Sequence, residues 1–122
     1  MHPSVVADAG GLLTLSGLVE GVSHEVDEIC ALDASAILAA QILELHHEGA
    51  PARAITEYGL LVGTVQEWFP VRALAMDAAI HRTDRELPLD SVAALLLAES
   101  MTVPLVTKLR ELTSKKIPVL YA

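Results

Sequence analysis

The chain has 122 residues, which is enough for a buried core, and we expect residues 1–122 to form a single domain. The composition is 52% hydrophobic but only 3% aromatic, so the core must consist mainly of aliphatic side chains. The 16 acidic and 8 basic residues give a net charge of -8. This charge argues against broad, sequence-independent nucleic-acid binding, which depends on lysine and arginine neutralising phosphates.

Cysteine usage and the apolar runs bear on where the protein resides. A single cysteine, Cys30, excludes an internal disulfide bond and fits a reducing compartment. The first residues lack the basic region of a secretory signal, and the longest unbroken apolar run, residues 92–98, is far too short to span a bilayer. We therefore expect a cytoplasmic protein without a membrane segment.

The first thirty residues predict one strand and a connection. Residues 4–7 form an apolar run that predicts a short buried strand ending at Asp8. Residues 9–11 contain two glycines, which indicate a tight turn or a loosely started helix. Residues 16–30 are mostly polar and predict a connecting segment with some helical character.

Two helices are expected next. Residues 33–48 predict the clearest helix, because its leucines and isoleucine recur at helical spacing: Leu38, Ile42 and Leu45. Pro51 fits the first turn of a second helix that continues to about residue 67. The short turn between them predicts a helical hairpin.

The second half of the chain alternates short strands and helices. The expected elements are a strand at 69–74, a polar helix at 76–86, an apolar helix that begins at Asp90 or Ser91 and ends at residue 101, a strand at 103–107, a short helix at 109–113 and a strand at 117–121. Pro118 favours an edge position for the last strand. This alternation predicts an α/β fold, a three-layer α/β/α domain with a short central parallel sheet.

The last quarter of the chain resembles a known family. The apolar helix at 91–101 leads through a turn into a strand that ends at Thr107, and Lys108, Leu109 and Arg110 follow. This arrangement resembles the C-terminal half of a PIN domain, the fold of VapC-type toxin ribonucleases. The resemblance implies a PIN-like fold with four acidic positions. In the family their carboxylates hold Mg²⁺ or Mn²⁺, which activates a water and stabilises charge on the scissile phosphate.

The first two acidic positions differ in how well they match. Asp8 follows the first strand, as the family's first acid does, although it can also be an aspartate that caps a turn. Gln41 stands where the family usually has glutamate. Glu44 lies on the same helical stripe, so it either reaches the site in place of Gln41 or is a solvated surface residue.

The third and fourth positions also depart from the family. Ser91 stands in the usual aspartate position and Asp90 precedes it, so Asp90 either turns into the site or caps its helix. Leu109 occupies the fourth position and cannot ligate a metal. Lys108 and Arg110 beside it either contact a phosphate or a partner's carboxylate, or are solvated.

A second candidate start lies further along the chain. The Asp-Ala-Ser sequence at residues 33–35 also resembles the family's first motif. A start there leaves too little chain before Asp90 for the helical hairpin, so we keep Asp8 as the first acidic position. Residues 9–32 match the family poorly.

These observations predict a PIN-like domain that resembles toxin–antitoxin ribonucleases but is catalytically impaired. We expect it to act through protein association, as a homodimer with an antitoxin-like protein partner. The alternative is an active Mg²⁺-dependent endoribonuclease, with catalytic Asp8 and Asp90 holding Mg²⁺ or Mn²⁺ and Glu44 assisting. The net charge argues against RNA as a partner. A third possibility is an unrelated small α/β domain.

Overall fold

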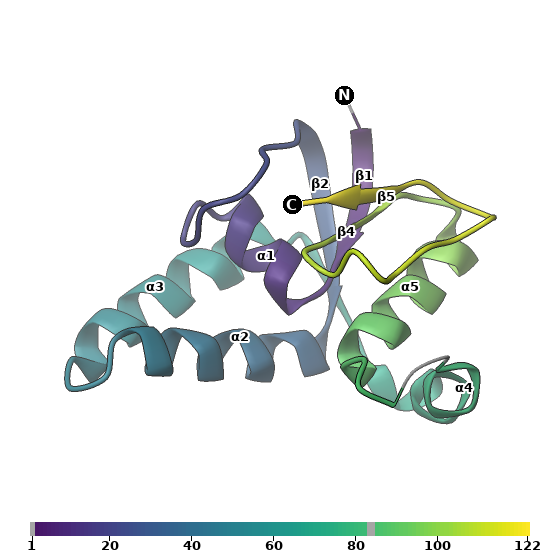
Figure 1. The fold of residues 1–122 in the computed structure, drawn as a ribbon. Helices are drawn as coiled ribbons and strands as arrows, with labels where there is room; N and C mark the ends of the chain where they lie inside the picture. Colours follow the sequence, from purple (N-terminus) through teal and green to yellow (C-terminus); the bar gives the residue numbers. More distant parts are fainter. Residues whose placement is uncertain (1, 83–84) are drawn as a thin grey trace.

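The computed structural model describes residues 2–82 and 85–122. These residues form an all-parallel, five-stranded sheet with the strand order β3-β2-β1-β4-β5 (Figure 1). The strands are β1 (His2–Ala7), β2 (Val26–Leu32), β3 (Glu67–Phe69), β4 (Leu105–Thr107) and β5 (Val119–Tyr121). The predicted three-layer α/β/α class is confirmed.

Helices cover both faces of the sheet, as Figure 1 shows. One face carries α1 (Ala9–Leu15), α2 (Asp33–His46) and α3 (Pro51–Thr64), and the other carries η1 (Val71–Ala73), α4 (Ala75–His81) and α5 (Leu89–Met101). The period of two along a strand produces this division. In β1, Val5 and Ala7 pack towards α1–α3, whereas Val6 packs towards α5.

The core is aliphatic, as the composition requires. The largest wholly buried side chains include Leu12, Leu32, Leu43, Leu61 and Leu105, one from each of five elements. Burying a side chain of this size stabilises a fold by about 1.5–3 kcal/mol. These five residues come from the sheet and from the layer of α1–α3, whereas the opposite layer buries smaller side chains such as Ala94 and Ala98 of α5.

The strand order places a reversal of direction between β1 and β4. The chain proceeds from β1 to β2 and β3 on one side, and then crosses back to β4 and β5 on the other side. Because parallel crossovers are right-handed, connections in opposite directions put their helices on opposite faces. In such sheets the crevice at the carboxyl ends of the strands beside the reversal is the common ligand site. In this chain that point is the end of β1 and β4.

The structure corrects several expected elements. β2 lies at Val26–Leu32, where we expected a polar connection; Asp27 and Glu28 in its first half are exposed and charged, and only its last four residues are buried. The strand expected at 69–74 is β3 at Glu67–Phe69 followed by the 3₁₀ turn η1, and the helix expected at 109–113 is a turn. The polar helix expected at 76–86 ends at His81, and residues 83–84 of that prediction lie outside the described residues.

Other expectations are confirmed. Pro51 occupies the first turn of α3, and α2 and α3 form the predicted hairpin, in which Gly49 has φ +82°. Pro118 precedes β5, which lies at an edge of the sheet. Within residues 2–82 and 85–122, none of the helices has the length and apolarity needed to cross a membrane.

Candidate functional site

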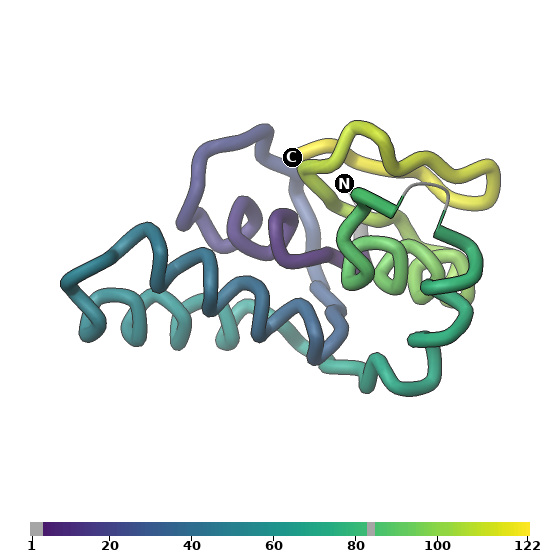
Figure 2. Tube along the Cα trace, turned by 60° about the horizontal axis from the view of Figure 1, so that its bottom comes forward, coloured from purple at the N-terminus to yellow at the C-terminus, as the bar shows by residue number. Residues whose placement is uncertain are grey.

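A pocket of about 260 Å³ lies at the carboxyl ends of β1 and β4, at the reversal of strand order. Its lining comes from the starts of α1 and α5 and from the middle of α2. Figure 2 shows the path of the backbone through these helices. The lining residues are Asp8, Ala9, Gly10, Leu38, Gln41, Ile42, Pro88, Asp90, Ser91, Lys108 and Leu109.

Asp8 joins three elements at the floor of this pocket. It ends β1 and caps α1, because its Oδ1 accepts a hydrogen bond from the Gly11 amide at 2.9 Å. Its Oδ2 accepts hydrogen bonds from the hydroxyls of Thr107 at 2.6 Å and Ser91 at 2.7 Å. Thr107 belongs to β4 and Ser91 to α5, so one buried carboxylate connects β1, β4 and α5.

Gly11 allows α1 to lie this close to the sheet. A Cβ atom at this position would lie 2.1 Å from the carbonyl oxygen of Val106, a backbone atom that cannot move aside freely. The glycine therefore permits the approach that brings the Gly11 amide to Asp8.

Asp90 lies beside Asp8 and has different partners. Its Oδ2 accepts hydrogen bonds from the Ala9 amide at 3.3 Å and from the Ser35 hydroxyl at 3.1 Å. The Ser91 hydroxyl lies 3.5 Å from Asp90 Oδ1, but its single proton serves the shorter bond to Asp8. The Oδ1 atom of Asp90 thus retains acceptor capacity at the pocket.

Burial dominates the electrostatics of both carboxyl groups. It raises the pKa of Asp8, although hydrogen bonds from Thr107, Gly11 and Ser91 act in the opposite direction. Burial also raises the pKa of Asp90, and the neighbouring charge of Asp8 raises it further. The pair therefore resists full ionisation, because two close carboxylates disfavour each other's charge.

The ammonium group of the neighbouring Lys108 does not point at Asp8 and Asp90. Its stem lines the pocket and lies against Gly10, where a Cβ atom would be 3.3 Å from Lys108 Cγ. Its Nζ atom donates instead to the carbonyl of Glu20 at 2.7 Å. The walls that remain are mainly apolar, from Leu38, Ile42 and Leu109, so the pocket combines an acidic floor with apolar sides.

The sequence-predicted residues divide into two groups. Asp8 and Asp90 line the same pocket, and Gln41 lines it as an exposed residue of α2. Glu44 is not brought to the site: it is exposed and lines a separate cavity of about 250 Å³ between α2 and α3, with Ile55 and other residues of α3. Three residues along a helix advance about 4.5 Å. The shared stripe therefore carries Glu44 towards the hairpin and away from Asp8.

The capping alternatives also resolve. Asp8 caps α1 and faces the site at the same time. Asp90 is not the N-cap of its helix, which is Pro88; it lies in the first turn of α5, and its Oδ2 accepts the amide of Ala9 in α1. Asp33 anchors a loop, because its Oδ1 accepts a hydrogen bond from the Val71 amide at 2.9 Å.

Three hydroxyl residues of the site were missed as site residues by sequence reasoning. Ser35 lies in the Asp-Ala-Ser sequence that we set aside as a false start, and Ser91 stood in the position where the family has an acid. Thr107 served only to mark the end of a strand. The sequence does offer one sign of their role: Ser91 directly follows Asp90, and Thr107 lies two residues before Leu109, the fourth of the expected acidic positions.

The oxygen atoms of this site do not fit a resident Mg²⁺ ion. Mg²⁺ takes near-octahedral oxygen ligands. Protein donors already use both oxygens of Asp8 and the Oδ2 atom of Asp90. The remaining family positions provide only the neutral amide of Gln41 and the apolar Leu109.

Another part of the sheet carries a different set of possible ligand atoms. Within the described ranges, the one group of three such residues is Glu28, Cys30 and Glu67 on β2 and β3, whose candidate atoms lie within 4.8 Å of one another. Burial, followed by the charges of Glu28 and Glu67, raises the pKa of Cys30 to about 11. A thiol with this pKa is a poor metal ligand, because the thiolate is the binding form.

The chemistry of the pocket suits binding. Its lining, as far as the chain is described, includes no histidine that can activate Ser91, and this hydroxyl already donates to Asp8. The Oδ1 atom of Asp90 can accept a hydrogen bond from a ligand, and the apolar walls can pack against the ligand's stem.

Neither a scan against the models of known protein families nor a search of curated proteins finds a match to the chain.

Proposed function

We propose that this protein is a PIN-like domain that has lost nuclease chemistry and acts by binding a protein partner in the cytoplasm, in the manner of a toxin with its antitoxin. The observation that carries the proposal is that the carboxylates of Asp8 and Asp90 accept hydrogen bonds from several elements of the fold. Both oxygens of Asp8 and one oxygen of Asp90 are engaged by protein donors that join β1, β4, α1, α2 and α5. These groups hold the fold together where the family holds metal.

The pocket favours a basic side chain of the partner. A positive charge beside Asp8 and Asp90 would offset the mutual repulsion that raises the pKa of Asp90. The Oδ1 atom of Asp90 supplies the acceptor, while Leu38 and Ile42 supply an apolar wall for a methylene stem. The net charge of -8 adds long-range attraction for a basic partner.

A titration with n-butylguanidinium tests this proposal, because it carries the charged group of arginine on an apolar stem. We expect NMR shifts at the amides of Ala9 and Leu109, and at least tenfold weaker binding in Asp90→Asn. The neutral analogue n-butylurea and the variant Asp27→Asn, an exposed carboxylate on β2, are the matched controls. Binding that is equal for both compounds, or unchanged in Asp90→Asn, would exclude a basic anchor in this pocket.

The proposal includes a homodimer. Apolar side chains on α2 and α4 are unusually exposed: Ile37 is 75%, Met76 69% and Ile80 66% accessible. Met76 and Ile80 are four residues apart on α4 and share one face of that helix, and neighbouring exposed apolar residues are typical of contact surfaces. Light scattering at micromolar concentration is expected to give twice the chain mass, and Ile80→Glu is expected to give a monomer. A monomeric wild type would remove this part of the proposal.

The alternative is an active Mg²⁺-dependent endoribonuclease, and the shared position of Asp8 and Asp90 in one pocket favours it. Residues that would hold the ion are these two aspartates, with the substrate's phosphate as a further ligand. Titration with Mn²⁺, followed by electron paramagnetic resonance, separates the two functions. We expect equally weak Mn²⁺ binding by the wild type and Asp8→Asn, whereas tight binding that is lost in Asp8→Asn would favour the nuclease.

A further inference from the structure

The segment that joins β4 to β5 has a charge opposite to that of the whole protein. It contains Lys108, Arg110, Lys115 and Lys116, four of the chain's 8 lysine and arginine residues, and all four are exposed. Its acidic residue is Glu111. A concentration of positive charge on a chain of net charge -8 is a local feature with its own binding preference.

These cations are not used in ion pairs by the described part of the chain. The salt bridges found in residues 2–82 and 85–122 connect Glu57 with His47 and Arg53, on the helical hairpin. Lys108 donates to a neutral carbonyl, that of Glu20. Although acids outnumber bases two to one, the segment's positive charges thus form no salt bridge with an acidic residue in the described ranges.

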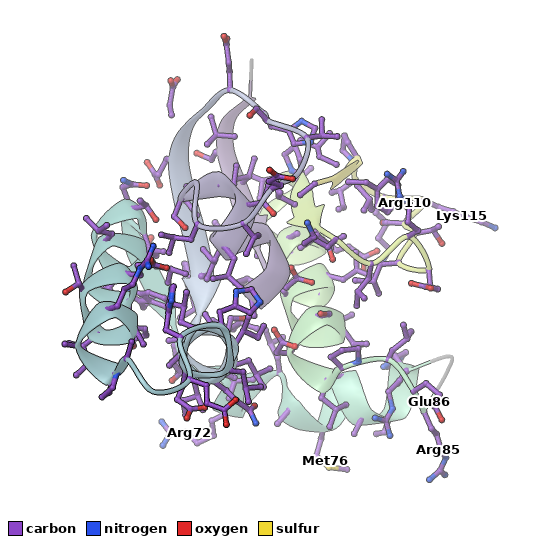
Figure 3. All side chains as sticks on the ribbon, turned by 60° about the vertical axis from the view of Figure 1, so that its left-hand side comes forward. Arg72, Met76, Arg85, Glu86, Arg110 and Lys115 are labelled. Atoms are coloured by element: carbon purple, nitrogen blue, oxygen red, sulfur yellow. The ribbon has the colours of Figure 1, made fainter. Side chains whose placement is uncertain are left out.

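Arg110 is held in a defined position. Its guanidinium carbon lies 5.3 Å from the centroid of the Tyr121 ring, and the Tyr121 hydroxyl donates to the carbonyl of Leu112. A cation–π contact engages the charge of the guanidinium with the ring and does not consume its N–H donors. Those donors match the two oxygens of a carboxylate. Figure 3 shows Arg110 and Lys115 on the same side of the molecule, with Lys115 extending outwards.

The segment is continuous with the pocket described above, because Lys108 and Leu109 line it. We infer that residues 108–116 form a recognition surface for an acidic stretch of a protein partner, with Arg110 as its carboxylate clamp. The inference extends the proposed function: the partner carries a basic anchor for the pocket and acidic residues next to it. A short acidic stretch of a protein is favoured over RNA, because the segment's four cations are few for neutralising the phosphates of a long polyanion.

Binding of a fluorescent hexaglutamate peptide, followed by anisotropy, tests this inference. We expect binding that weakens as salt increases, and at least a tenfold loss in the double variant Arg110→Gln, Lys115→Gln. Arg110→Lys keeps the charge but removes the planar fork, so we expect an intermediate loss. Arg72→Gln, an exposed arginine on η1, is the control that should bind like the wild type.

Two outcomes would overturn the inference. One is unchanged hexaglutamate binding in the double variant. The other is tighter binding of a six-nucleotide RNA than of hexaglutamate, with the same loss in the double variant, which would identify the surface as one for phosphates. The two proposals can fail independently of each other. Asp90→Asn should leave hexaglutamate binding unchanged, and the double variant should still bind n-butylguanidinium in the pocket.

Discussion

Replacing Asp90 by asparagine is expected to stabilise this protein at neutral pH. The amide oxygen can take the place of Oδ2 and keep the hydrogen bonds from the Ala9 amide and the Ser35 hydroxyl. The amide nitrogen then faces Ser91 Oγ, 3.5 Å from the present Oδ1 position, and can donate to it. The variant thus keeps the hydrogen bonds of Oδ2, adds a donor to Ser91 and removes a buried charge.

The size of the effect follows from these contacts. One added hydrogen bond contributes about 1 kcal/mol, and removal of the charge acts in the same direction, so we expect a total gain of about 1–2 kcal/mol. For a chain of 122 residues this gain raises the Tm by about 3–8 °C.

The gain depends on pH, with a defined sign. The pKa of Asp90 is higher in the folded state than its ordinary value of 3.8, so the folded protein binds more protons between these two pKa values. The free energy of unfolding of the wild type therefore falls as the pH rises through that window. Asparagine does not titrate, so its advantage is largest above the folded pKa and smallest below about pH 4.

Urea unfolding between pH 4 and pH 8 measures this directly, with the single tryptophan, Trp68, as the fluorescent probe. Asp27→Asn, at an exposed carboxylate, should match the wild type at every pH. A less stable Asp90→Asn at pH 7, or a difference that does not change with pH, would refute the reasoning. The first result would mean that the fold or a bound ion requires the ionised carboxylate, and the second that folding does not raise the pKa of Asp90.

Three further predictions concern the packing around the site. Gly11→Ala should lower the free energy of unfolding by more than about 2 kcal/mol, because its Cβ would lie 2.1 Å from the Val106 carbonyl oxygen. The control Gly59→Ala, in open space on α3, should raise the free energy of unfolding by about 0.5–1 kcal/mol. Equal effects of the two variants in urea unfolding would contradict the close approach of Gly11 to Val106. Thr107→Val should cost about 2 kcal/mol, because it removes a hydrogen bond to a buried carboxylate, and a loss below 0.5 kcal/mol would count against that bond. Cys30 is wholly buried with its pKa raised to about 11, so a thiol reagent at pH 8 should modify it only in urea, and rapid reaction of the folded protein would disprove its burial.

The fold class could be predicted because its signals are local. Apolar runs at residues 4–7 and 103–107 mark β1 and β4, and helical spacing marks α2. β2 could not be found in this way, because Asp27 and Glu28 in its first half are charged and exposed. Its position depends on pairing with β1 and β3, which are distant in sequence.

The site shows the same division between local and distant information. Asp8 and Asp90 could be selected because each stands at the boundary of an element. Ser35 could not, since it is 55 positions away from the Asp90 carboxylate that accepts its hydrogen bond. For Glu44, helical periodicity identified the stripe correctly, but the direction of α2 relative to α5 decides which end of that stripe reaches the pocket.

Cleavage of RNA in the presence of Mn²⁺ tests most directly whether Asp8 and Asp90 serve structure and binding in place of catalysis. A panel of structured and single-stranded RNAs would be incubated with the wild type and with Asp8→Asn at equal concentration. We predict no cleavage by the wild type above the level of the variant. Metal-dependent cleavage that Asp8→Asn abolishes would contradict the proposed function and establish the nuclease alternative.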